Sequence, residues 1–270
     1  MKLNKNIISI GGVGGSGTRV IAQILQECGY FTGYDLNESN DTLLFTLLFK
    51  RQNILTLDNN EFEEALNLFS KIMSSKESLT QKELTLLKGL ASKNRMLHDK
   101  EWLQERLEFI NERKLHENWG WKEPNTHIVI EKLLKKMHSL KFVYVYRNGL
   151  DMAYSDNQNQ LKLWGPIFLN DFNLDVNPKN SLKYWCITHK RMLKLKEMFQ
   201  NRIFILDFDK LCNDSEDILL KLADFMDYKE DMLKFQTFIK APKSIGRHKE
   251  HSLNDFDKED LDYIHDIYQI

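Results

Sequence analysis

Two patterns of apolar and polar positions follow one another along the chain, and each predicts a different kind of element. Ile7, Ile8 and Ile10 form a short apolar run that is typical of a buried strand, and it leads directly into a group of glycines. Beyond the glycines, apolar residues recur at helical spacing as far as Gly29, a typical helix stop. These residues are Val20, Ile21, Ile24, Leu25 and Cys28. The chain therefore opens as a strand, a glycine-rich turn and a helix.

The block from about residue 41 to residue 116 has the apolar spacing of helices and many charged residues. Thr80 and Glu83 fit a capping box at the start of one of these helices. No convincing strand occurs in the block. We expect a single domain over residues 1–270, in which residues 41–116 are a helical insertion that caps whatever the glycine-rich turn binds.

Strands and helices alternate again from Trp119 onwards. Residues 142–146 are aromatic and β-branched, as in a strand, and they end at the turn signal Arg147-Asn148-Gly149. An amphipathic helix is predicted over residues 182–199, then a strand at residues 203–206. Asp214 or Ser215 would cap the helix that follows. This alternation predicts an α/β fold with a parallel sheet covered on both faces.

Composition and charge narrow the functional classes. The 270 residues include 38 Lys+Arg and 39 Asp+Glu, which gives a net charge of −1, and 42% are hydrophobic. These values exclude a disordered chain and argue against a nucleic-acid partner. The three cysteines are far apart and form no CxxC pair, so neither a disulfide framework nor a zinc site is indicated.

The location of the protein is predicted from the same features. Few cysteines fit a reducing compartment. The first apolar run is too short for a signal peptide, and no apolar stretch approaches the ~20 residues of a membrane span. We expect a cytoplasmic protein with no membrane span, and the sequence leaves its oligomeric state open.

The segment from Gly11 to Arg19 is the strongest single feature of the sequence. Its glycines let the backbone approach an anion closely, and the N-terminus of the following helix adds backbone N–H donors. Five glycines within seven residues, with Ser and Thr hydroxyls beside them, argue against a turn that has no ligand. We predict a phosphate-binding loop whose ligand-binding residues are Gly14, Gly15, Ser16, Gly17, Thr18 and Arg19.

This loop differs from two familiar nucleotide loops. In an alignment with the ATP/GTP loop GxxxxGK[ST], Thr18 takes the place of the lysine and Arg19 the place of the magnesium-binding hydroxyl. An ordinary NTPase is therefore disfavoured. The GxGxxG pattern of dinucleotide folds is present, but the acidic residue expected after a second strand is not evident.

Arg147 and Ser155 form a second candidate anion site. The strand end places Arg147 at the carboxyl edge of the sheet, where open α/β folds bind ligands, and a helix after the turn brings Ser155 back towards the same anion. The forked guanidinium and the hydroxyl suit a phosphate. The alternative is a surface arginine paired with Asp151. Together with the first loop, this pair implies a ligand with two separated phosphate groups.

Taken together, these stretches resemble the sulfotransferase family. The glycine-rich loop is similar to the family's 5′-phosphosulfate loop, and the stretch from Arg147 to Ser155 is similar to its 3′-phosphate motif. Trp121-Lys122-Glu123-Pro124 resembles the Lys-Glu/Asp-Pro element of the bacterial and tyrosylprotein branches. Residues 204–211 are similar to the family's late strand and turn, and Ser244-Ile245-Gly246-Arg247 resembles its C-terminal closing segment. The resemblance covers residues 6–35 and roughly 117–250.

The resemblance implies an enzyme with a P-loop-NTPase-like fold and no metal. It would transfer a sulfuryl group from 3′-phosphoadenosine 5′-phosphosulfate (PAPS) to an acceptor hydroxyl or amine and release 3′,5′-adenosine bisphosphate (PAP). Arg247 would join Arg147 and Ser155 in binding the nucleotide. The acceptor would be a small molecule or a carbohydrate, although a lipid headgroup or a peptide is also open.

The loop departs from the family at one position that matters for catalysis. The family usually has Lys or Arg directly before Ser-Gly-Thr, and here that residue is Gly15. We expect Arg19 or Lys122 to supply the missing charge, with Lys122 preferred because it matches the family's second catalytic lysine. The alternative role for Lys122 is an ion pair with Glu123 or another neighbour.

The general base has several candidates, because the acceptor must lose a proton as it attacks. Glu38 and Asp41 follow the first helix at a distance similar to that of the family's glutamate, and we rank them above Asp35 and His127. Asp41 with Thr42 also fits the start of a helix.

Two other classes of function remain open on the sequence. A nucleotide-dependent phosphotransferase or NTPase with an atypical loop is favoured by Asp207, which follows a predicted strand as a magnesium ligand would. A non-catalytic nucleotide-binding relative is favoured by Gly15 in place of a cation. Magnesium dependence would separate the first from a sulfotransferase, and a measurable transfer rate would exclude the second.

Overall fold

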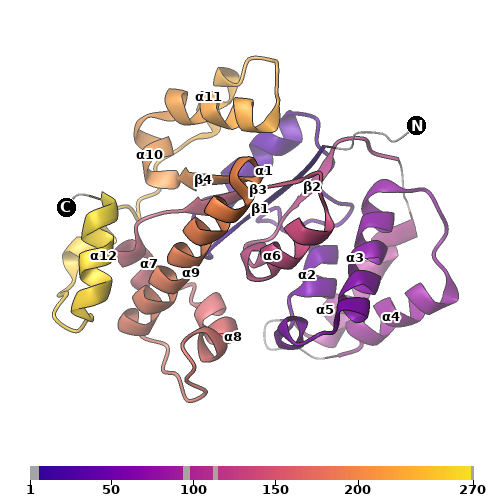
Figure 1. Cartoon of the computed structure of the whole chain (residues 1–270), viewed down its shortest axis with the longest axis horizontal. Helices are drawn as coiled ribbons and strands as arrows, with labels where there is room; N and C mark the ends of the chain where they lie inside the picture. The colour runs from indigo at the N-terminus through magenta and orange to yellow at the C-terminus, as the bar shows by residue number, and fades with distance from the viewer. Residues whose placement is uncertain (1–5, 94–97, 112–114, 269–270) are drawn as a thin grey trace. The chain divides into compact units, whose positions relative to one another are not determined.

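The computed structural model describes residues 6–93, 98–111 and 115–268. Its strands are β1 (Ile7–Gly12), β2 (Trp119–Lys122), β3 (Leu140–Tyr146) and β4 (Ile203–Asp207), in the sheet order β2-β1-β3-β4. β1 and β2 are parallel with Ile10 opposite Lys122, and β3 and β4 are parallel with Tyr146 opposite Asp207. The predicted α/β fold with a parallel sheet is confirmed (Figure 1).

By its internal contacts the chain divides into two compact units. The first comprises Met1–Ile10 and Ile21–Lys141, and the second comprises Gly11–Val20 and Phe142–Ile270. The division passes through β1, through the first helix α1 (Thr18–Glu27) and through the start of β3. That the units fold as one domain stays a prediction.

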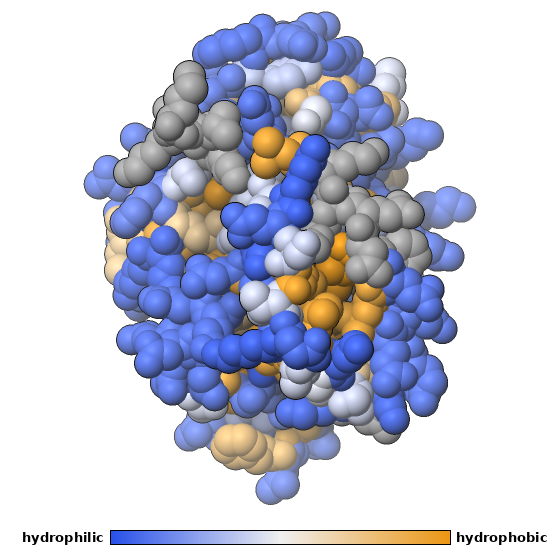
Figure 2. Space-filling model, turned by 90° about the vertical axis from the view of Figure 1, so that its right-hand side faces the viewer, coloured by the Kyte–Doolittle hydropathy of each residue, from blue (hydrophilic) through white to orange (hydrophobic). Residues whose placement is uncertain are grey.

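Between Leu43 and Asn111, the described residues of the first unit form helices and no strand. The helices are α2 (Leu43–Phe49), η1 (Gln52–Leu55), α3 (Asn59–Ser74), α4 (Gln81–Ala91), α5 (Lys100–Glu105) and η2 (Arg106–Asn111), and α6 (Thr126–Lys136) follows β2. The predicted capping box is present at α4, where Thr80 N donates to Glu83 Oε2 at 2.6 Å and Glu83 N donates to Thr80 Oγ1 at 3.3 Å. Hydrophilic side chains cover most of the face drawn in Figure 2, with a small apolar region among them.

Aromatic rings join the helices of the first unit to β2. The Phe45 ring of α2 stacks on Trp121 with 5.4 Å between centroids, and the Phe69 ring of α3 meets Trp121 edge-on at 5.1 Å. All three side chains are fully buried. Burial of rings of this size is worth several kcal/mol of folding free energy, at roughly 25 cal/mol per Å². This packing fixes the carboxyl end of β2, which carries Lys122.

The second unit surrounds the long helix α9 (Pro178–Phe199). Its other elements are α7 (Gly149–Ala153), α8 (Asn159–Phe168), η3 (Gln200–Arg202), α10 (Phe208–Asn213), α11 (Ser215–Met226), η4 (Leu233–Phe238), η5 (Arg247–Glu250) and α12 (Lys258–Tyr268). α9 packs against α7, α8, β4 and α12. Asp214 takes the N-cap position of α11 as predicted, but its side chain makes no capping hydrogen bond.

Among the described residues there is neither a membrane-spanning helix nor a metal-binding cluster. No helix among them is long and apolar enough to cross a membrane. Over the same residues, no group of three or more His, Cys, Asp and Glu side chains is arranged to hold a metal ion.

We predict that His189 makes the stability of the protein depend on pH. Its ring is 3% exposed, stacks on Trp185 at 4.9 Å between centroids, and has Nδ1 2.8 Å from the Tyr263 hydroxyl. Burial lowers the pKa of His189 from 6.5 to about 4. The unfolded chain therefore binds the proton more readily, so this contribution to stability is complete above pH 6.5 and is lost as the pH falls towards 4.

Urea unfolding at several pH values measures the effect. We expect the unfolding free energy to fall by at most about 3 kcal/mol across this window in the wild type, and the fall to be smaller in His189→Phe. His265→Asn, a change at an exposed histidine of α12, serves as the control and should keep the wild-type slope. An unchanged slope in His189→Phe would show that other groups titrate instead.

Candidate active site

The glycine-rich loop joins β1 to α1, and its residues Gly11–Val20 belong to the second unit. Gly15 and Gly17 both have φ of 88°, in the left-handed region that favours glycine. Ser16 N closes a turn by donating to Val13 O at 3.2 Å. α1 begins at Thr18, so the first backbone N–H groups of this helix, which have no acceptor within it, lie at the end of the loop. This is the local structure of an anion cradle.

The loop is packed too closely for side chains at two glycines. A β-carbon added at Gly12 would lie 2.1 Å from the Val145 carbonyl oxygen of β3, and one at Gly17 would lie 2.3 Å from the Phe208 ring of α10. From α8, Gln160 Nε2 donates to Gly12 O at 2.9 Å. Three elements distant in sequence therefore support the loop. Gln160 could not be predicted from the sequence, because no motif marks an amide on a later helix as a support for the loop.

Arg147 follows β3 directly and lies in the interior, with its side chain 5% exposed. Nη1 donates to Ser244 Oγ at 3.0 Å, Nη2 lies 3.5 Å from Asp151 Oδ2, and Nε lies 3.8 Å from Asp209 Oδ1. It is therefore not the surface arginine of the alternative interpretation, although it does lie beside Asp151. Burial is the main reason that the pKa of Asp209 is raised, although the Asn148 N–H and Arg147 oppose it.

Ser155 lies beside the loop, and Arg247 contacts Tyr154, the residue that precedes Ser155. A methyl group added at Gly15 would lie 3.4 Å from Met152 Cε and 4.0 Å from Ser155 Oγ. Arg247 Nη1 donates to Tyr154 O at 3.2 Å. The second unit contains all of the predicted nucleotide-binding residues: Gly14, Gly15, Ser16, Gly17, Thr18, Arg19, Arg147, Ser155 and Arg247.

Polar atoms of the loop and of Arg147 fit a phosphate-bearing ligand. Ser16 Oγ and the Nε and Nη2 atoms of Arg147 are buried and make no hydrogen bond within the part of the chain that the structure describes. Buried polar groups are rarely left without a partner. A hydroxyl donor and a forked cationic donor are the groups that phosphate oxygens accept from most strongly.

Lys122 ends β2 in the first unit, opposite Ile10, which directly precedes Gly11 in the chain. Its side chain is 3% exposed, and Nζ donates to Asp41 Oδ1 at 2.5 Å and to Ser39 O at 2.9 Å. The structure therefore brings two of the predicted catalytic residues together as an ion pair between a buried lysine and a partly buried aspartate. The partner of Lys122 is Asp41, and Glu123 is occupied elsewhere.

Glu123 is almost completely buried beside Lys50, 3.5 Å from its Nζ. Its carboxylate accepts from Asn125 N at 2.6 Å and from Asn125 Nδ2 at 2.8 Å. Burial raises the pKa of Glu123, which Lys50 partly opposes. Neighbouring residues of the Lys-Glu-Pro element thus take separate partners, and the charge of Glu123 is balanced without Lys122.

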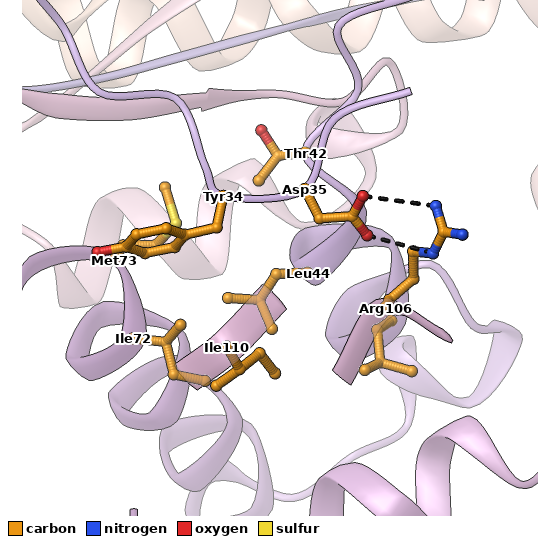
Figure 3. Close-up of a pocket in the computed structure, with 9 residues that line it drawn as sticks. Tyr34, Asp35, Thr42, Leu44, Ile72, Met73, Arg106 and Ile110 are labelled. Atoms are coloured by element: carbon orange, nitrogen blue, oxygen red, sulfur yellow. Dashed lines mark hydrogen bonds and ion pairs between the residues drawn. The ribbon is translucent and has the colours of Figure 1, made fainter. Parts of the chain in front are cut away.

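The four candidate bases have different surroundings. Asp41 pairs with Lys122, Glu38 is exposed, and His127 is fully buried. Asp35 forms an ion pair with Arg106 at 3.3 Å, at the edge of a cavity of about 20 Å³ that Figure 3 shows. The predicted helix start after Asp41 is confirmed at Leu43, but Thr42 makes no capping bond and donates its hydroxyl to Thr32 O instead.

The helical block offers two aromatic residues, Trp102 and Phe109, for the wall of an acceptor pocket, and the structure describes the side chain of one of them. Trp102 stacks on His98 with 4.1 Å between centroids and lies under the Arg106 guanidinium. The Phe109 side chain, the second aromatic residue that the sequence offers for a pocket wall, lies outside the described residues.

Asp207 has a structural role at the end of β4. Its Oδ1 accepts from Asp209 N at 3.0 Å and from Lys210 N at 3.1 Å, and its Oδ2 accepts from the Tyr146 hydroxyl at 3.2 Å. These bonds cap α10. The feature that most favoured a magnesium-dependent phosphotransferase is therefore accounted for by helix capping.

Comparison with known proteins identifies the class. The sulfotransferase family model matches residues 8–231, most of the chain. The chain therefore belongs to the sulfotransferase family, whose reaction is the transfer of a sulfuryl group. No curated protein matches it.

Solved structures of low sequence identity also match. The sulfotransferase domain of the Synechococcus PCC 7002 olefin synthase is 14% identical, with 99% of this chain and 96% of that chain covered and a TM-score of 0.49. Sulfotransferase STF9 from Mycobacterium avium is 14% identical over 98% and 75% of the two chains, with a TM-score of 0.43. A retinol dehydratase in complex with retinol and PAP is 14% identical over 98% and 80%, with a TM-score of 0.42.

We predict that Gly17→Ala destabilises the protein far more than Gly29→Ala. Both residues have positive φ, 88° and 84°, so both variants lose roughly 1–2 kcal/mol from backbone strain. The added methyl group at Gly29 meets nothing within 4 Å, whereas at Gly17 it meets the Phe208 ring. Gly17→Ala should lose roughly a further 1–3 kcal/mol of unfolding free energy in urea titrations. Equal losses would mean that the loop does not rest on Phe208.

Proposed function

We propose that this protein transfers the sulfuryl group of PAPS to a hydroxyl or amine of a small-molecule or carbohydrate acceptor and releases PAP. The observation that carries the proposal is a set of buried donors in the second unit that make no hydrogen bond within the described part of the chain, namely Ser16 Oγ and two nitrogens of Arg147. The loop and the Arg147, Ser155 and Arg247 group match a ligand with two separated phosphates, as PAPS has.

The proposed binding roles follow from the donors that each group offers. The loop N–H groups, with Ser16, Thr18 and Arg19, hold the 5′-phosphosulfate at the N-terminus of α1. Arg147, Ser155 and Arg247 hold the 3′-phosphate with charge-assisted hydrogen bonds. The two carboxylates beside Arg147 keep its guanidinium in place.

When bound, PAPS supplies a sulfuryl group attached to a phosphate leaving group. In the transfer, the acceptor oxygen or nitrogen forms a bond to sulfur, the bond from sulfur to the phosphate oxygen breaks, and the acceptor proton passes to a base. The fixed donors of the loop stabilise the negative charge that develops on the phosphate. In this proposal the N–H and cationic donors stabilise the charge, and no metal takes part.

We assign to Lys122 the role of the cation that the loop lacks at Gly15. Its ammonium has three donor protons, and Asp41 and Ser39 O accept two of them. The third proton can be donated to the phosphosulfate. Support for this role comes from the register of β2, where Lys122 lies opposite the residue that precedes the glycine-rich loop.

Asp41 and Glu38 have different parts in this proposal. Asp41 lies 2.5 Å from the Lys122 ammonium, so its carboxylate is already engaged in an ion pair. Asp41 therefore orients Lys122, and the exposed Glu38 of the same segment accepts the acceptor proton. Asn37 holds this segment, because its Oδ1 accepts from Ser39 N and Asp41 N at 2.9 Å each.

We predict that PAP stabilises the protein without a metal. A thermal shift with PAP at a hundredfold excess over its dissociation constant should correspond to about 2.7 kcal/mol. The shift should be lost in Arg147→Ala and kept in Arg202→Ala, a change at an arginine outside the loop region. A shift with ATP and magnesium alone would instead support the phosphotransferase. Binding of PAP with no transfer to any acceptor would support the non-catalytic relative.

We also predict that changes at Lys122 reduce turnover and spare nucleotide binding. Lys122→Met should lower kcat by roughly 10²–10³-fold, the effect of removing one donor to the developing charge, while the PAP dissociation constant changes little. PAP release from PAPS, with a panel of phenols, alcohols and sugars as acceptors, measures it. Lys135→Met on the exposed face of α6 is the matched control. Full turnover in a folded Lys122→Met protein would refute the assignment.

A further inference from the structure

The segment that contains Arg247 is attached to α7 through one buried carboxylate. Asp151 Oδ2 accepts from Gly246 N at 2.7 Å, and Asp151 Oδ1 accepts from His248 N at 3.2 Å. The same Oδ1 lies 2.6 Å from His248 Nδ1. The Asp151 side chain is 2% exposed, and that of His248 is 13% exposed. One side chain of α7 thus holds two residues that flank Arg247.

The charge of Asp151 is stabilised by these contacts. Burial raises the pKa of Asp151, but the hydrogen bonds from His248 and Gly246 outweigh it, and the net pKa is lowered from 3.8. The carboxylate is therefore ionised and accepts hydrogen bonds only. His248 must carry its proton on Nδ1 to donate, whether the ring is neutral or charged.

The attachment sets the position of two side chains that approach the predicted nucleotide site. Ser244 Oγ accepts from Arg147 Nη1 at 3.0 Å, two residues before Gly246. Arg247 donates from Nη1 to Tyr154 O and from Nε to Ser244 O at 3.4 Å. Among the residues that the structure describes, neither hydrogen bond of Arg247 uses its Nη2, so this nitrogen can donate to an anion.

We propose that His248 is a positioning residue for nucleotide binding, in that its Nδ1–H bond to Asp151 holds residues 244–247 where Arg247 meets the 3′-phosphate. His248 does not itself contact the nucleotide. The inference rests on the proposed function, since it concerns the same phosphate. It assigns a role to a histidine that lies outside the loop and outside the Arg147 to Ser155 stretch.

The geometry of the side chains gives a sharp test. An asparagine can place its Nδ2 donor where the His248 Nδ1 lies, and so can bond to Asp151. A glutamine places its donor further from the backbone, where the histidine has Nε2. The backbone bond from residue 248 to Asp151 is available in every variant. The variants His248→Ala, His248→Asn and His248→Gln therefore differ mainly in whether a side-chain donor occupies the position of His248 Nδ1.

PAP binding by titration calorimetry on the full chain is the first measurement. Loss of a hydrogen bond to a buried carboxylate should weaken PAP binding by about tenfold to a hundredfold in His248→Ala. His248→Asn should restore most of the affinity, and His248→Gln should not. His265→Ala, on the exposed side of α12, is the control and should bind as the wild type does.

Kinetics separate positioning from a general loss of structure. The KM for PAPS should rise in His248→Ala while kcat stays within about twofold, because the donor that acts on the leaving phosphate is unchanged. The melting temperature of the ligand-free protein is measured for all three variants. If it falls in parallel with the affinity for PAP, His248 has a structural role and the inference is overturned.

The failures of the two proposals are distinguishable. If the wild type binds PAP and His248→Ala binds it equally well, the positioning role is wrong and the proposed function stands. The same conclusion follows if His248→Asn is no better than His248→Gln. If the wild type itself does not bind PAP, the proposed function fails, and the positioning role fails with it.

Discussion

Close packing of the backbone at the glycine-rich loop is the constraint on which the rest of the site depends. The chain passes so near the Val145 carbonyl and the Phe208 ring that Gly12 and Gly17 have no room for a β-carbon. Such contacts fix the path of the loop before any ligand is present, and they place the start of α1 at its end. An anion site built from backbone N–H groups needs this rigidity, because its donors have no side-chain freedom with which to adjust.

Both units also contain buried charged side chains that lie beside groups of opposite charge. Lys122 lies against Asp41, Glu123 against Lys50, and Arg147 near Asp151 and Asp209. A buried ion is costly unless it is paired and hydrogen-bonded, so these partners are needed to keep the cations in the interior at all. At Lys122 and Arg147 the ion pairs leave at least one N–H without a hydrogen bond in the described part of the chain. The cation is then stable in the interior and can still donate to a ligand.

The sequence predicted the order of elements and the loop because both rest on local signals. The apolar runs, Gly29 as a helix stop and the Thr80 capping box involve residues close in the chain. The partner of Lys122 was not predictable in this way, since Asp41 lies 81 residues earlier and Glu123 is the immediate neighbour. Gln160 and His248 were missed for the same reason. Each acts on a backbone or a carboxylate that only the fold brings to it, and neither belongs to a short motif.

Gly15 shows how the absence of a cation can follow from backbone geometry. With φ of 88°, a lysine or arginine at this position would cost roughly 1–2 kcal/mol in strain, even though a β-carbon there would be in ordinary contact with Met152 Cε at 3.4 Å. The loop conformation therefore favours glycine at this position, and the missing charge is a consequence of that conformation. Any charge that acts on a ligand at Gly15 has to come from another segment. Within the first unit, the Lys122 ammonium keeps one donor proton after its bonds to Asp41 and Ser39 O.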